Sequence, residues 1–292
     1  MTSTPPVTGS AAFLAAYDEV VAAMWPAGTT PTEVPTPYGT THLNSYGPED
    51  APPLLLLPGG GATSTVWYAQ AADLGRTHRV HAVDLVGEPG RSVVGERPIR
   101  TAGDLYGWLD ALLDGLGAGP AALCGHSYGG WIALHYALHA PHRVRKLILL
   151  DPTGCFAGFR PGYLLHALPM LLRPSAARTR AFLEWETGGA PLDPDWVRLR
   201  EAASGFPAAR PVTGPRPSPE ALRGLGVPAL VLLAGQGRAH DATRVAATAE
   251  RLLPRAKAAV LPGVSHHALP LYGPAVPELN RLIGRFLDDP GR

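Results

Sequence analysis

Short apolar runs alternate along this 292-residue chain with longer segments in which apolar residues recur at helical spacing. The short runs lie at 41–46, 54–57, 80–84, 121–124, 147–150, 229–233 and 258–261. The helical patterns cover 13–25, 101–116, 128–140, 243–253 and 277–287. Strands that alternate with helices of this length pair as a mostly parallel sheet with helices on both faces. The sequence therefore predicts an α/β fold.

The alternation stops between residues 152 and 222. This stretch holds 11 prolines and 7 glycines, several aromatic residues and no run that resembles a strand. A connection of this length inside a compact domain usually has a function of its own. We interpret residues 152–222 as a largely helical insertion that forms a cap or lid. The core then comprises residues 1–151 and 223–292, with an N-terminal helix at about 11–25.

Charge and cysteine content exclude several classes of protein. The 25 basic and 24 acidic residues give a net charge of +1, whereas nucleic-acid-binding proteins usually carry a basic face. Two cysteines are too few for a disulfide framework or a zinc ribbon. The apolar runs are too short to span a bilayer, and the first ten residues lack the features of a signal peptide. We therefore expect a cytoplasmic protein with no nucleic-acid or membrane partner.

A glycine-flanked serine follows the fourth short run. Residues 125–129 read Gly-His-Ser-Tyr-Gly and fit the pattern G-x-S-x-G, with a strand pattern before them and a helical pattern after them. In that context the serine lies on a strained strand-to-helix turn with its hydroxyl exposed. Ser127 is therefore the predicted nucleophile. No dinucleotide-binding, Walker or zinc-protease motif occurs, so we expect no cofactor and no metal.

Four segments together resemble the α/β-hydrolase superfamily, and most of all its bacterial carboxylesterase-type members. They are residues 54–61 (LLLLPGGG), 84–92 (DLVGEPGRS), 125–130 (GHSYGG) and 261–266 (LPGVSH). The resemblance implies an α/β-hydrolase fold, with a mostly parallel sheet of the eight-stranded type, flanking helices and a helical lid. It also implies a serine hydrolase that cleaves an ester or related acyl bond through an acyl-enzyme intermediate.

The resemblance assigns a base and two oxyanion donors to positions in this chain. His266 stands where the family has its catalytic histidine, and its neighbour His267 is the less favoured candidate. A neutral imidazole can accept the serine proton and return it to the leaving group. The backbone N–H groups of Gly60, or alternatively Gly61, and of Tyr128 stand where the family holds the oxyanion.

The sequence offers two candidates for the triad acid. Family members commonly place a carboxylate three residues after the glycine that ends the preceding strand, and Arg238 occupies that position after Gly235. Asp241 is the nearest carboxylate in the same loop and is the favoured acid. Asp151, directly after the run at 147–150, is the alternative.

The insertion is rich in aromatic residues and leucines, which predicts a small apolar substrate. The predicted substrate-binding residues are Phe159, Tyr163, Trp185 and His267. Two departures from the family, Pro58 in place of a histidine and the arginine at the acid position, leave other functions open. One is a non-hydrolytic enzyme on the same scaffold, such as a cyclase, lyase or acyl transferase of natural-product biosynthesis. The other is a ligand-binding protein with a degraded triad.

Overall fold

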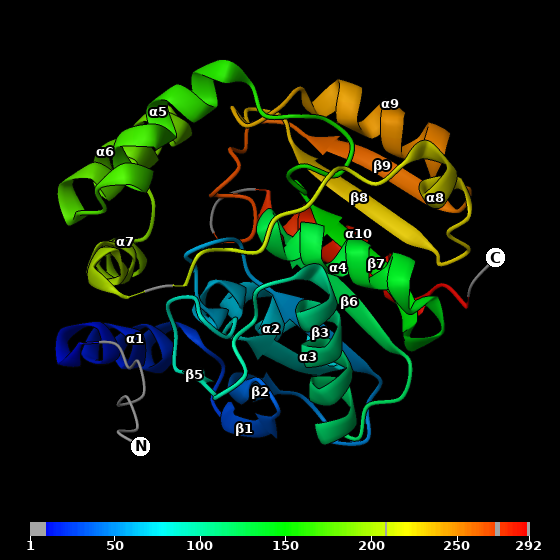
Figure 1. Ribbon diagram of the computed structural model, residues 1–292, viewed down its shortest axis with the longest axis horizontal. Coiled ribbons are helices and arrows are strands. Elements are labelled where there is room, and N and C mark those ends of the chain that lie inside the picture. The colour runs from blue at the N-terminus through cyan, green and yellow to red at the C-terminus, as the bar shows by residue number, and fades with distance from the viewer. Residues whose placement is uncertain (1–9, 208, 272–274, 291–292) are drawn as a thin grey trace.

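A computed structural model of the chain describes residues 10–207, 209–271 and 275–290. In this part of the chain a nine-stranded sheet runs through the middle of the molecule (Figure 1). The strands are β1 (Thr30–Thr36), β2 (Gly39–Tyr46), β3 (Pro53–Leu57), β4 (Arg79–Val83), β5 (Val93–Val94), β6 (Ala121–His126), β7 (Val144–Leu150), β8 (Ala229–Ala234) and β9 (Ala256–Leu261). Their order in space is β1-β2-β4-β3-β6-β7-β8-β9, and β5 pairs with β2.

The sheet is mostly parallel, as the alternation of strands and helices predicted. Strands β4, β3, β6, β7, β8 and β9 pair in parallel, whereas β2 is antiparallel to β1, β4 and β5. The sequence did not predict β1 or β5. Strand β1 contains two prolines and buries only Val34, which is typical of an edge strand and leaves no apolar run.

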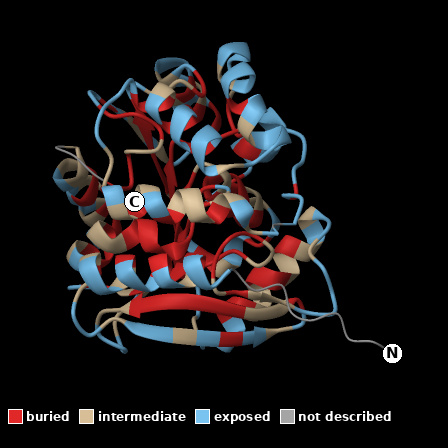
Figure 2. Cartoon of the chain, turned by 90° about the vertical axis from the view of Figure 1, so that its left-hand side faces the viewer, coloured by how far each residue is buried: buried red, intermediate tan, exposed pale blue. Residues whose placement is uncertain are grey.

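Helices cover both faces of the sheet. The α-helices of the described residues are α1 (Ala11–Met24), α2 (Tyr68–Leu74), α3 (Ala102–Gly115), α4 (Tyr128–His139), α5 (Pro161–Leu172), α6 (Ala176–Thr187), α7 (Pro194–Ala202), α8 (Pro219–Arg223), α9 (Ala242–Leu252) and α10 (Val276–Asp288). Figure 2 shows that the buried residues concentrate in the sheet and on the inner helix faces, with exposed residues on the outer faces.

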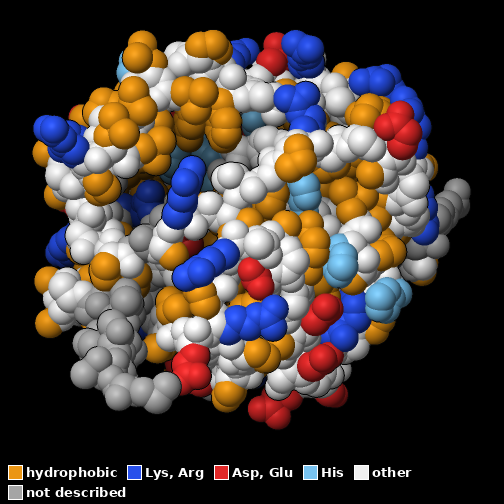
Figure 3. Space-filling view, in the orientation of Figure 1, with side chains coloured by type: hydrophobic (Ala, Val, Ile, Leu, Met, Phe, Trp, Pro, Cys, Tyr) orange, Lys and Arg blue, Asp and Glu red, His pale blue; other side chains and the backbone are white. Residues whose placement is uncertain are grey.

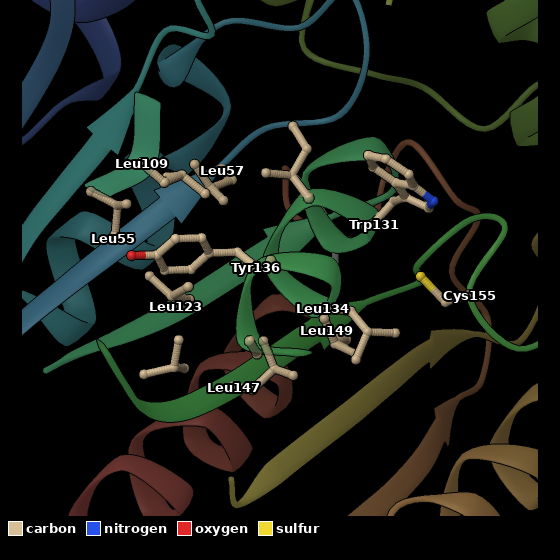
Figure 4. Packing of buried hydrophobic residues seen from close by; sticks show 14 of the residues in the cluster. Leu55, Leu57, Leu109, Leu123, Trp131, Leu134, Tyr136, Leu147, Leu149 and Cys155 are labelled. Carbon is tan, nitrogen blue, oxygen red and sulfur yellow. The ribbon is translucent and has the colours of Figure 1, made fainter. Parts of the chain in front are cut away.

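Successive leucines of one strand face opposite layers of the core. Leu55 and Leu57 of β3 belong to the core cluster that includes residues of α3, α4 and α9, and Figure 4 shows both beside Tyr136 of α4. Leu54 and Leu56 lie in the other cluster, with α2 and α10. Side chains alternate in this way along any strand. A run of leucines without polar residues is therefore what a strand covered on both faces requires.

The segment at 152–222 contains α5, α6 and α7, which lie to one side of the sheet, and α8 crosses its predicted end at residue 222 (Figure 1). Helix α1 supports this group, because Phe13 and Tyr17 pack against Leu199 of α7. The boundaries of the insertion, and its action as a lid, stay predictions.

Helix α5 carries apolar residues on more than one face. Leu165, Leu171 and Leu172 are 68%, 64% and 71% exposed, while Ala167 is buried on the inner side.

No helix in the described part of the chain is both long enough and apolar enough to cross a membrane.

Candidate active site

Ser127 lies on a sharp turn between β6 and α4. Its backbone has φ 52° and ψ −113°, a conformation that non-glycine residues rarely adopt. The neighbouring glycines are required by space. A Cβ atom on Gly125 would lie 2.2 Å from the carbonyl oxygen of Gly129, and one on Gly129 would lie 2.2 Å from the carbonyl oxygen of Leu57. The pattern G-x-S-x-G thus allows strand, turn and helix to meet beneath an accessible serine.

The structure brings Ser127, His266 and Asp151 into one hydrogen-bonded line. The Nε2 atom of His266 lies 2.9 Å from Ser127 Oγ, and its Nδ1 atom lies 2.6 Å from Asp151 Oδ2. An Nδ1–H that donates to the carboxylate leaves Nε2 free to accept the serine proton. The line therefore has the geometry of a nucleophile, a base and an orienting acid.

The preference for Asp241 as the partner of His266 is wrong, and the alternative Asp151 makes that contact. The Asp241 side chain is 52% exposed and lies 3.8 Å from an Arg160 nitrogen. Its Oδ1 atom accepts a hydrogen bond from the Arg244 N–H, which caps the first turn of α9. A carboxylate at an N-cap is used by the helix itself, and here it does not reach the imidazole.

Asp151 is buried at the end of β7 and has several polar partners. Its Oδ1 atom accepts from the Ala234 N–H at 3.1 Å and lies 2.9 Å from His240 Nε2. Burial alone would raise the pKa of the carboxyl, but the hydrogen bonds from His240 and His266 hold that pKa well below its usual range. The group is therefore ionised at neutral pH and can orient an imidazole.

A second buried carboxylate, that of Glu186 on α6, holds the loop that carries His266. It accepts a hydrogen bond from the His266 N–H at 2.9 Å and lies 3.0 Å from His267 Nδ1. Burial disfavours the imidazolium of His266, but Asp151 and then Glu186 raise the pKa of His266 above its ordinary value. On the other side of the loop, His126 Nε2 lies 2.9 Å from the His266 carbonyl oxygen.

The backbone N–H groups of Gly60 and Tyr128 donate to no acceptor among the described residues. Both residues line the same cavity as the serine. The alternative donor, Gly61, does not fit, because its N–H donates to Glu88 Oε2 at 2.8 Å. The N–H groups of Gly60 and Tyr128 are therefore free to donate to a negatively charged oxygen next to Ser127.

A cavity of about 430 Å³ opens above Ser127 and His266. Phe159, Tyr163 and His267 line it, and their contact with a substrate stays a prediction. Trp185 does not line the cavity, because its ring stacks on His166 at 4.0 Å and lies under the Arg238 guanidinium. Figure 3 shows the hollow on this face, bordered by hydrophobic side chains on the side where α5 lies. The mainly apolar wall suits a small organic ligand.

The sequence did not predict the roles of three polar residues around the cavity: Glu186, His240 and Arg200. None of the three belongs to a sequence motif. Only their positions in the folded protein indicate a role. Among the described residues, no group of three or more His, Cys, Asp or Glu side chains is placed to hold a metal ion.

Comparison with known proteins gives a consistent result. The sequence model of the alpha/beta hydrolase family matches residues 54–276. The chain is 32% identical over 176 residues to carboxylesterase YbfK of Bacillus subtilis, an alignment that covers 60% of this chain and 58% of that protein. It is 29% identical over 265 residues to the uncharacterized carboxylesterase nap of the same organism, covering 86% and 84%.

Solved structures extend the likeness over nearly the whole chain. The crystal structure of naproxen esterase from Bacillus subtilis superposes with a TM-score of 0.87 at 28% identity and covers 96% of this chain and 99% of that one. Carboxylesterase CesB (YbfK) gives a TM-score of 0.86 at 27% identity, with 94% and 97% covered. The predicted α/β-hydrolase fold, apart from the lid, and the predicted resemblance to carboxylesterases are confirmed.

Proposed function

The chain belongs to the alpha/beta hydrolase family and is an ester hydrolase, and we propose that it cleaves esters of small, largely apolar acids through an acyl-enzyme on Ser127. The observation that carries the proposal is the hydrogen-bonded line from Ser127 Oγ to His266 (2.9 Å) and from His266 to Asp151 (2.6 Å). Ser127 and His266 line the apolar cavity.

In the first half of the reaction, Ser127 Oγ attacks the ester carbonyl while its proton passes to His266 Nε2. The Asp151 carboxylate orients the ring and stabilises the imidazolium. The N–H groups of Gly60 and Tyr128 donate to the oxygen that becomes negative, and two such donors contribute several kcal/mol to the transition state, on the order of 3 kcal/mol each. His266 then gives its proton to the leaving alcohol as the C–O bond breaks.

In the second half, water takes the place of the alcohol. His266 Nε2 accepts a proton from the water as its oxygen attacks the acyl carbon, and the same two N–H groups hold the oxyanion again. Collapse of this intermediate breaks the bond to Ser127 Oγ, which recovers its proton from His266. The products are a carboxylic acid and an alcohol, and no cofactor takes part in any step.

The substrate class follows from the cavity wall. A volume of about 430 Å³ accommodates a compact ligand. Met170 and Leu171 of α5 and Trp196 of α7 add to an apolar lining. The departure at Arg238 does not interrupt the proposed machinery, because Asp151 supplies the carboxylate. A small-molecule partner and a cytoplasmic location stay predictions from the sequence.

Replacing Ser127 with Ala tests the proposal. We expect the variant to lose turnover of p-nitrophenyl butyrate and labelling by a fluorophosphonate probe, and mass spectrometry of the wild type should find the label on the peptide with Ser127. A control variant, Ser265→Ala, removes a buried hydroxyl that has no hydrogen-bond partner among the described residues and should keep the label. Labelling of a different residue in the wild type would refute the assignment.

A further inference from the structure

Arg200 of α7 is the one lining residue of the described cavity with a permanently charged side chain. Every other lining residue is apolar, hydroxyl-bearing, glycine or histidine. A guanidinium is costly to bury next to apolar groups unless a counter-charge or hydrogen-bond acceptors compensate it. A wall built for a purely apolar ligand gains nothing from such a residue.

The described part of the protein leaves this guanidinium without full compensation. The Nε atom of Arg200 is buried and has no hydrogen-bond partner, and the side chain forms no ion pair there. The Glu88 carboxyl acts on Arg200 electrostatically, but the two side chains form no ion pair. One oxygen of Glu88 is already engaged by the Gly61 N–H.

The position of Arg200 ties it to the reacting centre. A Cβ atom on Gly61 would lie 3.0 Å from Arg200 Nη1, so the guanidinium lies against the glycine-rich loop that contains Gly60. The Trp196 ring, one turn earlier on α7, lies 5.9 Å from its central carbon. Because Arg200 and Ser127 line one cavity, a single small molecule can contact both.

We propose that Arg200 binds a carboxylate of the substrate that is separate from the ester being cleaved. The guanidinium offers N–H donors in a planar fork that matches a carboxylate and pairs with it through two hydrogen bonds. The preferred substrates are then half-esters, in which an apolar spacer joins the scissile ester to a free carboxylate. This inference rests on the proposed ester hydrolysis and adds the class of substrate.

The test compares substrates that differ only in the carboxylate. In the first series, mono-p-nitrophenyl adipate and p-nitrophenyl hexanoate share a six-carbon acyl chain. The second series uses acetyl esters of a hydroxy acid and of the matching alcohol, so that the carboxylate lies on the alcohol side of the scissile bond. The ratio of kcat/KM for the charged over the neutral ester is measured for the wild type, Arg200→Gln and Arg200→Lys. The control is Arg198→Gln, whose exposed arginine lies on the same helix and pairs with Glu19 and Asp195.

We expect Arg200→Gln to lower that ratio by about ten- to a hundredfold in at least one of the two series, because a charge-assisted pair is lost. Arg200→Lys should retain part of the ratio, and Arg198→Gln should leave it unchanged. Equal loss of activity toward charged and neutral esters, or an unchanged ratio in both series, would overturn the proposal. Thermal unfolding of each variant checks the fold, and Ser127→Ala separately tests ester hydrolysis itself.

Discussion

The Glu186 carboxylate accepts a hydrogen bond from the backbone N–H of His266 at 2.9 Å. Glu186 lies on α6 of the inserted segment, and its side chain is fully buried. It also lies within hydrogen-bond distance of His267 Nδ1. The segment above the cavity is thus joined to the loop that carries the proposed base, and the negative charge on Glu186 acts on the imidazole itself.

Replacing Glu186 with Gln should move the pH dependence of catalysis. His266 must be neutral to accept a proton, so kcat/KM rises as the pH rises through its pKa. The charge on Glu186 favours the imidazolium and raises the pKa of His266. Its removal lowers that pKa, and the acidic limb of the pH profile shifts to lower pH. We expect a measurable shift of the acidic limb to lower pH and a lower kcat.

A matched control for this variant is Glu184→Gln. Glu184 lies on the same helix but is exposed, so its neutralisation should leave the acidic limb where it is. An acidic limb that stays in place in Glu186→Gln, even with a lower kcat, would show that the carboxylate only supports the structure of the loop.

Replacing Asp151 with Asn should nearly abolish turnover. An amide in that position favours the wrong tautomer of His266 and cannot stabilise the imidazolium, an effect of about 10⁴-fold in kcat for a triad of this kind. Asp241→Asn should stay within about twofold, since asparagine also caps a helix and the side chain lies away from the imidazole. Steady-state kinetics of both variants decides the acid, and a large loss only in Asp241→Asn would reverse the assignment.

That Ser127 and His266 belong to one site could be predicted because their sequence signals are local. Ser127 lies between two glycines, Gly125 and Gly129, at which a side chain would clash with the backbone. His266 lies in the turn that follows the last strand. The acid could not be decided in this way. Strands β7 and β8 are parallel neighbours, so the loops that follow them begin at the same edge of the sheet. Asp151 and Asp241 were therefore both plausible from their positions.

The direction of a side chain decides between the two carboxylates. The carboxylate of Asp151, whose backbone φ is 43°, points to His266, whereas the carboxylate of Asp241 caps α9. The contacts of Glu186 and His240 join residues 80 and 89 positions apart. Such pairs leave no periodic or motif signal, because only the folded sheet and insertion bring them together.

The stability of the protein should fall on acidification in part through Glu186. Burial alone would raise the pKa of this carboxyl, but the hydrogen bond with His267 and nearby positive charge lower it to about 2. A carboxyl has a pKa of about 4.3 in the unfolded chain. Its contribution to the free energy of unfolding is therefore complete above about pH 4.3 and is lost as the pH falls toward 2.

Urea unfolding of the wild type and Glu186→Gln between about pH 6 and pH 2.5 measures this contribution. The difference in unfolding free energy between the two proteins should shrink over the lower half of that range. Glu184→Gln serves again as the exposed control and should differ little from the wild type throughout. A difference that stays constant with pH would contradict a depressed pKa at Glu186.

The turn around Ser127 should tolerate no side chain at its second glycine. A Cβ atom on Gly129 would lie 2.2 Å from the Leu57 carbonyl oxygen, which belongs to a central strand and has no free space to move into. Gly129→Ala should therefore lower the free energy of unfolding by about 1–3 kcal/mol or more and displace the nucleophile. Gly119→Ala is the matched control, because a Cβ atom there meets nothing within 4 Å. Thermal unfolding and fluorophosphonate labelling of both variants give the measurement, and equal stability of the two would show that strand β3 and helix α4 separate more readily than their packing implies.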